Sequence, residues 1–278
     1  PLEPARGGGD APVTDELQDL IRRSVAPILV PADDPRRAAL RQRVDASIAV
    51  AMRGLLHHRA FQALESLWRG VAMLARNLDT DALLHLHLLD VSIPELVADV
   101  AEAQGGSGGP SAIFRAIAGD AGGASEGEPW ALIVGAYTFG WDDADLLVLE
   151  HLADLARRSG APFVAGAAPR LVGARSFDPS SDAGDWSREP LPAWEAFRRS
   201  PNARWVGLVA PRFLARAPYG AQGDPCDEID FEELTAEPGP GDLLWANGAL
   251  ACARLLGQSF TAAGWRLRPG MIREIYGL

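Results

Sequence analysis

Two apolar strands separated by an amphipathic helix are the feature that most restricts what this chain can fold into. Residues 130–139 (WALIVGAYTF) and 161–169 (APFVAGAAP) carry no charge, and the predicted helix 142–160 between them has acidic residues first, arginines last and Gly160 at its end. These end charges complement the helix dipole, and glycine suits the position after a helix. Strand, helix and strand at this spacing predict a βαβ unit, which crosses over right-handed into a parallel sheet.

The region before this unit is mostly helical. Apolar residues at three-to-four spacing predict helices from Thr14, after Pro35 and from Arg59 to Asn77. The alternating run 83–92 (LLHLHLLDVS) predicts a strand, and Pro94 predicts the start of a further helix, with a serine nearby as its cap.

The region after the unit combines a strand, an acidic loop and a helix. Residues 203–211 predict a third buried strand, residues 224–237 an acidic loop with seven carboxylates, and residues 243–264 a helix. Residues 105–110 and 119–129 are glycine-rich linkers, with a short helix between them. We therefore expect an α/β fold, with a layered core of a mostly parallel or mixed sheet flanked by helices and a helical N-terminal segment.

The expected domain organisation is simple. Residues 1–13 are rich in glycine and proline and are predicted to be flexible, and residues 14–278 are predicted to form a single α/β domain. Within that domain we expect a helical part over 14–80, a sheet-containing core over 81–220, and the acidic loop with the C-terminal helix over 221–278.

Composition excludes several classes of protein. All 26 basic residues are arginine, so a P-loop NTPase and a Schiff-base enzyme, which need lysine, are excluded. The net charge of −11 argues against a nucleic-acid partner. No uncharged stretch approaches the about 20 residues of a membrane-spanning helix, so no membrane insertion is expected. Cys226 and Cys252 are too few for a disulfide framework or a four-thiolate zinc site, and the cytoplasm is the expected compartment.

Two polar motifs have simple structural explanations. Residues 105–109 (GGSGG) match the G-x-S-x-G nucleophile elbow, but an elbow needs a buried strand before its serine, and the preceding residues are polar and helical in pattern. A flexible linker is the better interpretation. Asp142, Asp143 and Asp145 could be mistaken for a metal cluster, yet helix capping and the helix dipole explain acidic residues in a first turn.

Histidines offer a possible metal site. His85 and His87 lie two apart on the predicted strand, so both would point to one face, and Asp90 and Asp99 could complete a site. The alternative, which we favour, is that neutral histidines fill the second face of a leucine-rich strand.

Arg212 and Arg216 lie four apart, and we expect them on one face of a single helical turn that Pro218 ends. They could grip a carboxylate or a phosphate. The preferred hypothesis is that they hold the acidic loop 224–237. No catalytic constellation emerges, so neither catalysis nor a cofactor is expected.

One segment resembles a known family. Residues 57–81 (HHRAFQALESLWRGVAMLARNLDTD) are similar to the signature helix of the large subunit of the type VI secretion contractile sheath. The matching positions are His57, His58, Phe61, Gln62, Trp68, Arg69 and Gly70. For His57 and His58 the residue pattern alone suggests capping or surface roles.

The resemblance continues in order to about Trp265. The most specific match is PRFLARAPYG (211–220), and the strand ending in Tyr-x-Phe precedes it. The matching positions are Tyr137, Phe139, Pro211, Arg212, Phe213, Leu214, Arg216, Pro218, Tyr219, Gly220, Phe231, Trp245, Asn247 and Trp265.

The resemblance implies a structural protein. Family members pair with a small sheath subunit and with copies of themselves, surround an inner tube protein, and are recycled by an ATPase. The family's chains extend further on both sides, so either a fragment or a shortened relative is expected. The alternative functions are a non-polymerising, sheath-like adaptor and, less favoured, a metal-dependent hydrolase that uses His85 and His87.

Overall fold

A three-stranded parallel sheet lies at the centre of the fold. Its strands are β1 (Ile133–Phe139), β2 (Phe163–Ala167) and β3 (Val206–Val209), in the order β1-β2-β3. Both pairs are parallel, with Phe163 opposite Ile133 on one side and Val206 on the other. The parallel βαβ unit and the α/β fold class are therefore confirmed. The computed structural model describes residues 18–21, 23–24, 35–105, 111–118, 130–177, 184, 186, 191–227 and 229–276.

Local capping explains where the helices before and inside the βαβ unit begin and end. In α6 (Asp143–Ser159) the Asp142 side chain accepts from the backbone N–H of Asp145 at 3.0 Å, and Gly160 ends the helix with φ of 72°. That φ lies in the left-handed region, which glycine adopts at no steric cost. In α4 (Ile93–Gln104) Ser92 is the N-cap and forms a capping box with Glu95.

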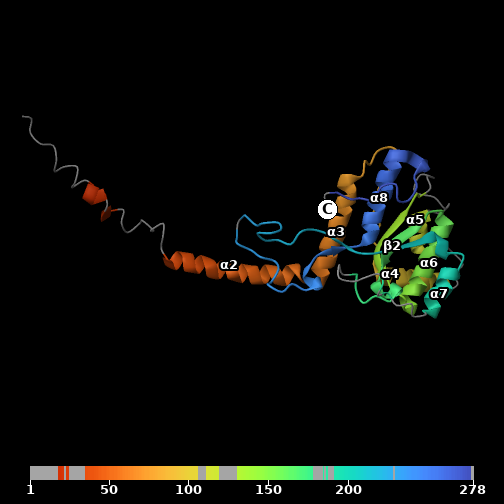
Figure 1. The fold of residues 1–278 in the computed structure, drawn as a ribbon, viewed down its shortest axis with the longest axis horizontal. Helices are drawn as coiled ribbons and strands as arrows, with labels where there is room; N and C mark the ends of the chain where they lie inside the picture. Colours follow the sequence, from red (N-terminus) through yellow and green to blue (C-terminus); the bar gives the residue numbers. More distant parts are fainter. Residues whose placement is uncertain are drawn as a thin grey trace, which may run out of the picture.

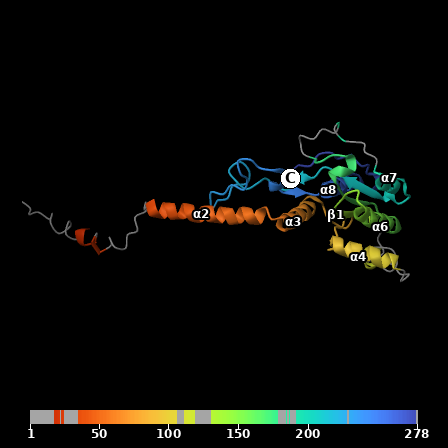
Figure 2. The ribbon, with the colours of Figure 1, turned by 90° about the horizontal axis from the view of Figure 1, so that it is seen from below.

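Helices cover both faces of the sheet (Figures 1 and 2). One face carries α6 with α4, α5 (Ala112–Ala118) and α7 (Pro192–Arg199), and this side holds the main core. Phe139, Leu149 and Phe163 are fully buried there. The other face carries α3 (Arg59–Asn77) and α8 (Gly248–Ala263), which lie side by side.

The helix α2 (Pro35–Leu56) projects from the body of the molecule (Figure 1). Only its last turns pack closely, where Ala49 and Leu56 are buried against Phe231. Among the described helices, none combines the length and the apolar character that crossing a bilayer needs.

Short elements complete the chain. Strands β4 (Phe213–Leu214) and β5 (Trp245–Ala246) form an antiparallel pair. The 3-10 turns are η1 (Pro169–Val172), η3 (Ala203–Trp205), η4 (Pro240–Asp242) and η5 (Gly264–Arg266).

The strand predicted over 83–92 is wrong. The described residues there form no backbone ladder, because Asp81 turns the chain by accepting from the N–H groups of Leu83 at 2.7 Å and Leu84 at 3.2 Å. Residues 83–92 contact β1 through a side chain instead: the Tyr137 hydroxyl donates to the Val91 carbonyl at 2.6 Å. Alternation of apolar residues makes a strand only where a partner supplies the ladder bonds.

The helical turn predicted around Arg212 and Arg216 is also wrong. A cis peptide bond precedes Pro211, and the chain then runs extended as β4. The ladder with β5 supplies the backbone partners that a helical turn would otherwise need, since Phe213 pairs with Ala246. The two arginines consequently reach different partners.

Two predicted boundaries need correction. The helix predicted over 243–264 begins only at Gly248, because Asn247 caps it and β5 precedes it. Leu244 is therefore buried outside the helix. The strand predicted over 203–211 is shorter, as its first residues form η3. Residues 106–110 and 119–129, which hold most of both predicted linkers, lie outside the described residues.

Candidate functional site

The most connected polar side chain among the family-like residues is Arg216, which is buried between two carboxylates. Its Nη1 and Nη2 donate to Glu233 at 2.6 and 2.9 Å, and its Nε donates to Glu65 at 2.8 Å. A longer bond of 3.5 Å joins Nη2 to the second oxygen of Glu65. Each edge of the planar guanidinium thus carries one carboxylate, a geometry that a lysine ammonium cannot reproduce.

Two further residues join these three. Arg69 donates from Nε to Glu65 at 2.8 Å and from Nη2 to the Tyr219 hydroxyl at 3.1 Å. The Arg216 guanidinium lies 4.3 Å from the centre of the Tyr219 ring. We call Glu65, Arg69, Arg216, Tyr219 and Glu233 the Arg216 network. It brings the Trp68-Arg69-Gly70 region of α3 against the 211–220 segment.

The network also holds the acidic loop, as the sequence hypothesis for Arg216 expects. Glu233 accepts from the Tyr219 backbone N–H at 2.8 Å, and its own N–H donates to the Tyr219 carbonyl at 2.9 Å. Gly220 has φ of 145°, and a methyl group there would overlap the Glu232 carboxylate. The sharp turn at Gly220 therefore lets the loop lie against the 211–220 segment.

The surroundings of Glu65 and Arg216 favour the charged forms of both side chains. Burial raises the pKa of Glu65, but hydrogen bonds from Arg216 and Arg69 outweigh it, so this pKa lies below its ordinary value. Burial likewise opposes the charge of Arg216, yet Glu233 and Glu65 raise its pKa further above an already high value. The pKa shifts of Glu65 and Arg216 therefore both favour the charged forms of these two groups.

His57 and Gln62 lie near the acidic loop and the turn that follows it. His57 lies 3.9 Å from Glu233 and 3.6 Å from Asp242, while Gln62 donates to the Gly241 carbonyl at 3.2 Å. His58 occupies the N-cap position of α3, but its side chain makes no capping hydrogen bond and is exposed.

Asn247 connects α8 to the sheet. Its Oδ1 caps α8 by accepting from the Ala249 N–H at 2.9 Å, and its Nδ2 donates to the Tyr137 carbonyl at 2.7 Å. Gly166 lies directly beneath this amide, where a methyl group would stand 2.8 Å from Nδ2. Asn247 is thus a positioning residue for the α8–sheet contact.

The other family-like residues divide by burial. Phe139 is in the main core, and Phe61 packs with Phe231 under the acidic loop. Gly70 lies so close to α8 that a methyl group would overlap Leu250. Pro211, Phe213, Leu214 and Pro218 lie in the segment that β4 organises, and Arg212 lies 5.5 Å from the Trp245 ring centre. Trp68 and Trp265, by contrast, are 59% and 78% exposed.

Several functional residues were missed by the sequence analysis. Glu65 and Glu233 are the counter-ions of Arg216, and Arg53 donates to the Glu232 carbonyl at 2.8 Å. The sequence does indicate part of the role of Glu65. It lies four positions before Arg69 on a predicted helix, a spacing that allows the two side chains to form an ion pair. Nothing in the acidic loop distinguishes Glu233 from its six neighbouring carboxylates.

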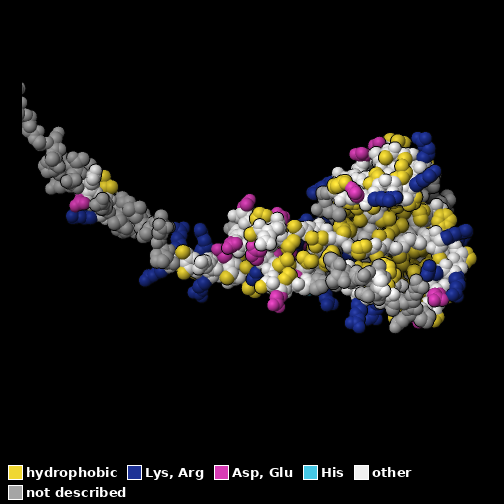
Figure 3. All heavy atoms as spheres, viewed as in Figure 1, with side chains coloured by type: hydrophobic (Ala, Val, Ile, Leu, Met, Phe, Trp, Pro, Cys, Tyr) yellow, Lys and Arg dark blue, Asp and Glu magenta, His cyan; other side chains and the backbone are white. Residues whose placement is uncertain are grey.

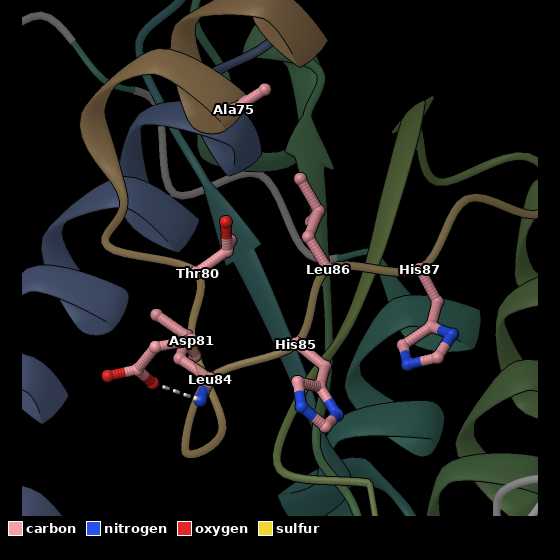
Figure 4. A pocket seen from close by; sticks show the side chains of 7 residues that line it. All are labelled: Ala75, Thr80, Asp81, Leu84, His85, Leu86 and His87. Atoms are coloured by element: carbon pink, nitrogen blue, oxygen red, sulfur yellow. Dashed lines mark hydrogen bonds between the residues drawn. The ribbon is translucent and has the colours of Figure 1, made fainter.

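The residues proposed for a metal site do not converge. His85 and His87 border a surface hollow of about 530 Å³ (Figure 4), with ring centroids 6.2 Å apart. The His87 ring packs edge-on against Trp130 at 5.1 Å, and Asp81 turns toward the Leu84 N–H. Within the described residues, no three His, Cys, Asp or Glu side chains are grouped to hold a metal ion.

Asp99 lies in a different environment from the one expected. Its Oδ2 lies 2.8 Å from His151 Nε2, and its Oδ1 accepts from the Ile113 N–H at 3.0 Å. Burial raises the pKa of Asp99, but the bonds from Ile113, Ser111 and His151 together lower it below its ordinary value. Asp90 is exposed.

The segment that matches the nucleophile elbow follows a helix. Gly105 ends α4, so a helix and no buried strand precedes the motif. The serine and the remaining glycines lie outside the described residues.

The fold and the Arg216 network define an α/β protein whose family-like polar residues bind its own elements to one another. Residues 39–270 match the family model VipB (EvpB/VC_A0108, tail sheath N-terminal domain), so the chain belongs to this tail sheath family. The resemblance found in the sequence is confirmed.

A curated relative gives the same result. Over 226 residues, or 80% of its length, the chain is 35% identical to the protein named Type VI secretion system sheath protein TssC1, from Pseudomonas aeruginosa. The chain spans 45% of that relative's length.

Proposed function

We propose that the chain is a structural component of a type VI secretion contractile sheath, which pairs with the small sheath subunit and with copies of itself around an inner tube. The observation that carries the proposal is the family match over 39–270, which contains the whole Arg216 network. A subunit that transmits force needs its segments tied together, and the network ties three of them.

Exposed apolar side chains on α2 support a role in assembly. At helical spacing, Leu40, Val44, Ile48 and Leu55 fall on one side of the helix, and each is at least 39% exposed. Figure 3 shows hydrophobic side chains gathered where α2 meets the body. A projecting helix of this length gains most of its stability from packing, so a partner chain along this stripe would stabilise it.

A second group of exposed apolar side chains lies on α3. Leu67 and Trp68 follow Leu64 by three and four positions on this helix, and the three side chains are 40%, 59% and 55% exposed, respectively. An exposed tryptophan next to leucines is typical of an interface anchor. We assign α2 and this side of α3 to the contact with the small sheath subunit.

The proposal includes no catalytic activity. Arg216 and Asn247, two polar residues of the family motifs, already bond within the chain, which leaves them poorly suited to act on a substrate. The inner tube protein and a recycling ATPase are further proposed partners, and the cytoplasm is the proposed location.

A matched pair of variants on α2 tests the assignment. Val44 and Val50 are both exposed on α2, and their spacing of six residues places them on different sides of the helix. We expect Val44→Asp to abolish co-purification with the co-expressed small sheath subunit of the same organism. Val50→Asp should co-purify like the unmodified chain.

The controls make the result decisive. Circular dichroism must show equal helix content in both variants. Equal retention of the small subunit by Val44→Asp and Val50→Asp would refute the assignment of the stripe. No co-purification of the unmodified chain would refute the proposed pairing itself.

A further inference from the structure

The first turns of α2 carry a concentration of positive charge on a chain that is acidic overall. Residues 35–44 contain four arginines and no acidic residue, whereas the net charge of the chain is −11. Arg37, Arg41 and Arg43 are exposed, and none of the three forms an ion pair with another described residue. Figure 3 shows arginine side chains along the part of α2 that projects from the body. We call residues 35–44 the basic start of α2.

The acidic loop 224–237 carries the opposite charge. No arginine lies between Arg216 and Arg254, so the seven carboxylates of the loop have no basic neighbour in the same stretch of chain. Of these carboxylates, Glu233 is paired with Arg216. Five others are exposed and form no ion pair with another described residue: Asp224, Asp227, Asp230, Glu232 and Glu237. The loop therefore presents a negatively charged surface.

Within one copy of the chain, the acidic loop packs on a different part of α2. It lies against the last turns of the helix, where Arg53 donates to the Glu232 carbonyl at 2.8 Å. Arg41 lies about 18 Å from Arg53 along the helix axis, at about 1.5 Å per residue. In Figure 3 acidic side chains gather where α2 approaches the body, and arginines lie further out along the helix. The basic start of α2 thus projects beyond the contact with its own loop.

We propose that the basic start of α2 in one copy of the chain binds the acidic loop of a second copy. This inference rests on the proposed function, because it specifies how copies of the chain contact one another. Two different surfaces meet in such a contact, so it is head-to-tail and can repeat from copy to copy. Pairing of α2 with α2, or of loop with loop, would bring like charges together, which costs binding free energy.

The contact leaves room on α2 for the small sheath subunit. Arg37 and Arg41 lie four apart, on one side of the first turns. Ile48 and Leu55, which belong to the apolar stripe assigned to the small subunit, lie further along the helix. The two partners would therefore bind one after the other along α2.

Sedimentation velocity of the chain alone tests the proposal. We would measure the weight-average sedimentation coefficient over a series of protein concentrations in sodium chloride at about 0.1 M and about 1 M. The Debye length falls from about 10 Å to about 3 Å between these conditions, so the dissociation constant for self-association should rise at least about tenfold. A chain that is monomeric in both conditions overturns this inference, whereas the pairing with the small subunit is decided by co-purification.

Charge reversal identifies the two surfaces. The α2 variant replaces Arg37, Arg41 and Arg43 by glutamate, so that acidic residues outnumber basic ones in the basic start of α2. The loop variant replaces Asp224, Asp227, Asp230 and Glu237 by arginine, so that basic residues outnumber acidic ones in the loop. Each variant alone should lose self-association, because its two surfaces then carry charge of the same sign. An equimolar mixture of the two variants should associate again, and its failure to do so would overturn the proposal.

A matched control separates the position of the charges from the change in net charge. Arg198, Arg266 and Arg268 are exposed and lie outside α2 and the acidic loop. Their joint replacement by glutamate changes the net charge as much as the α2 variant does, and this control should associate like the unmodified chain. Equal loss of association in the control and the α2 variant would contradict the proposal.

Circular dichroism must show equal helix content in all variants. The α2 substitutions place acidic residues near the start of a helix, where they complement its dipole, so this variant should keep its fold. If the loop variant does not fold, the comparison of the α2 variant with the control still decides the proposal. Loss of association in the loop variant but not in the α2 variant would assign the loop to another contact and overturn the proposal.

Discussion

Replacement of Arg216 by alanine should be among the most destabilising single changes in the chain. The substitution leaves Glu233, which is 1% exposed, and the largely buried Glu65 without their shared cation. Removal of one partner from a buried ion pair costs about 3–5 kcal/mol, because the other charge stays buried and unpaired. For a chain of this size that cost lowers the melting temperature by about 10 °C.

Urea unfolding followed by tryptophan fluorescence measures this free energy, and hydrogen exchange of residues 219–233 measures loosening of the acidic loop. Arg199→Ala is the matched control, since Arg199 pairs with Glu195 at 2.8 Å on the surface. An exposed pair of this kind contributes about 0.2–1 kcal/mol. The reasoning is refuted if Arg216→Ala costs no more than Arg199→Ala and leaves loop exchange unchanged.

A double variant tests whether the cost comes from the unpaired charge. Arg216→Met with Glu233→Gln removes the arginine and one of its two buried carboxylates, so it should be less destabilising than Arg216→Met alone. Additive costs of the two substitutions would contradict direct coupling between the two side chains.

Three further changes test other parts of the fold. Gly70→Ala should destabilise by about 1–3 kcal/mol in urea unfolding, because the methyl group would overlap a buried leucine of α8, whereas Gly54→Ala, with open space around it, should stabilise slightly. Asn247→Ala should cost about 1–3 kcal/mol, because it removes the α8 cap and leaves a β1 carbonyl without its donor. Asn247→Asp keeps the cap acceptor but cannot donate to the Tyr137 carbonyl, so it should also destabilise; unchanged stability of Asn247→Asp would contradict the role given to the amide. The pKa of Asp99 is lowered in the folded protein, so its contribution to stability is complete above the ordinary value of 3.8 and is lost as the pH falls below it. Asp99→Asn should therefore flatten the acid side of a plot of unfolding free energy against pH, and an unchanged slope would contradict this.

The elements that sequence could predict are those whose signals are local. The acidic first turn and the terminal glycine of α6 specify both ends of that helix, and the structure begins and ends it there. The uncharged runs on either side form β1 and β2, since a βαβ unit needs only its own residues to pair. Helices after Pro35 and over 59–77 follow the apolar spacing in the same way.

The features that sequence could not predict depend on distant partners. Residues 83–92 have the alternation of a strand but no ladder partner in the described part of the chain, whereas 213–214 form β4 because β5, about thirty positions later, supplies one. The candidate site shows the same limit. The motif residues could be found individually, whereas the pairing of Arg216 with Glu65, 151 positions away, follows only from tertiary structure.

The two buried arginines suggest how such a chain divides stability from assembly. Arg216 has every edge matched within the chain, so its environment is complete before any partner arrives. Within the described residues, Arg254 on α8 has unmatched donors, and α2 exposes apolar side chains that no other described segment covers. Buried polar groups whose hydrogen bonds are all made stabilise a subunit. Buried polar groups without partners raise the free energy of the isolated subunit, and a binding partner that supplies the missing hydrogen bonds lowers it. The matched environment of Arg216 therefore favours a rigid contact between α3, the 211–220 segment and the acidic loop within the subunit.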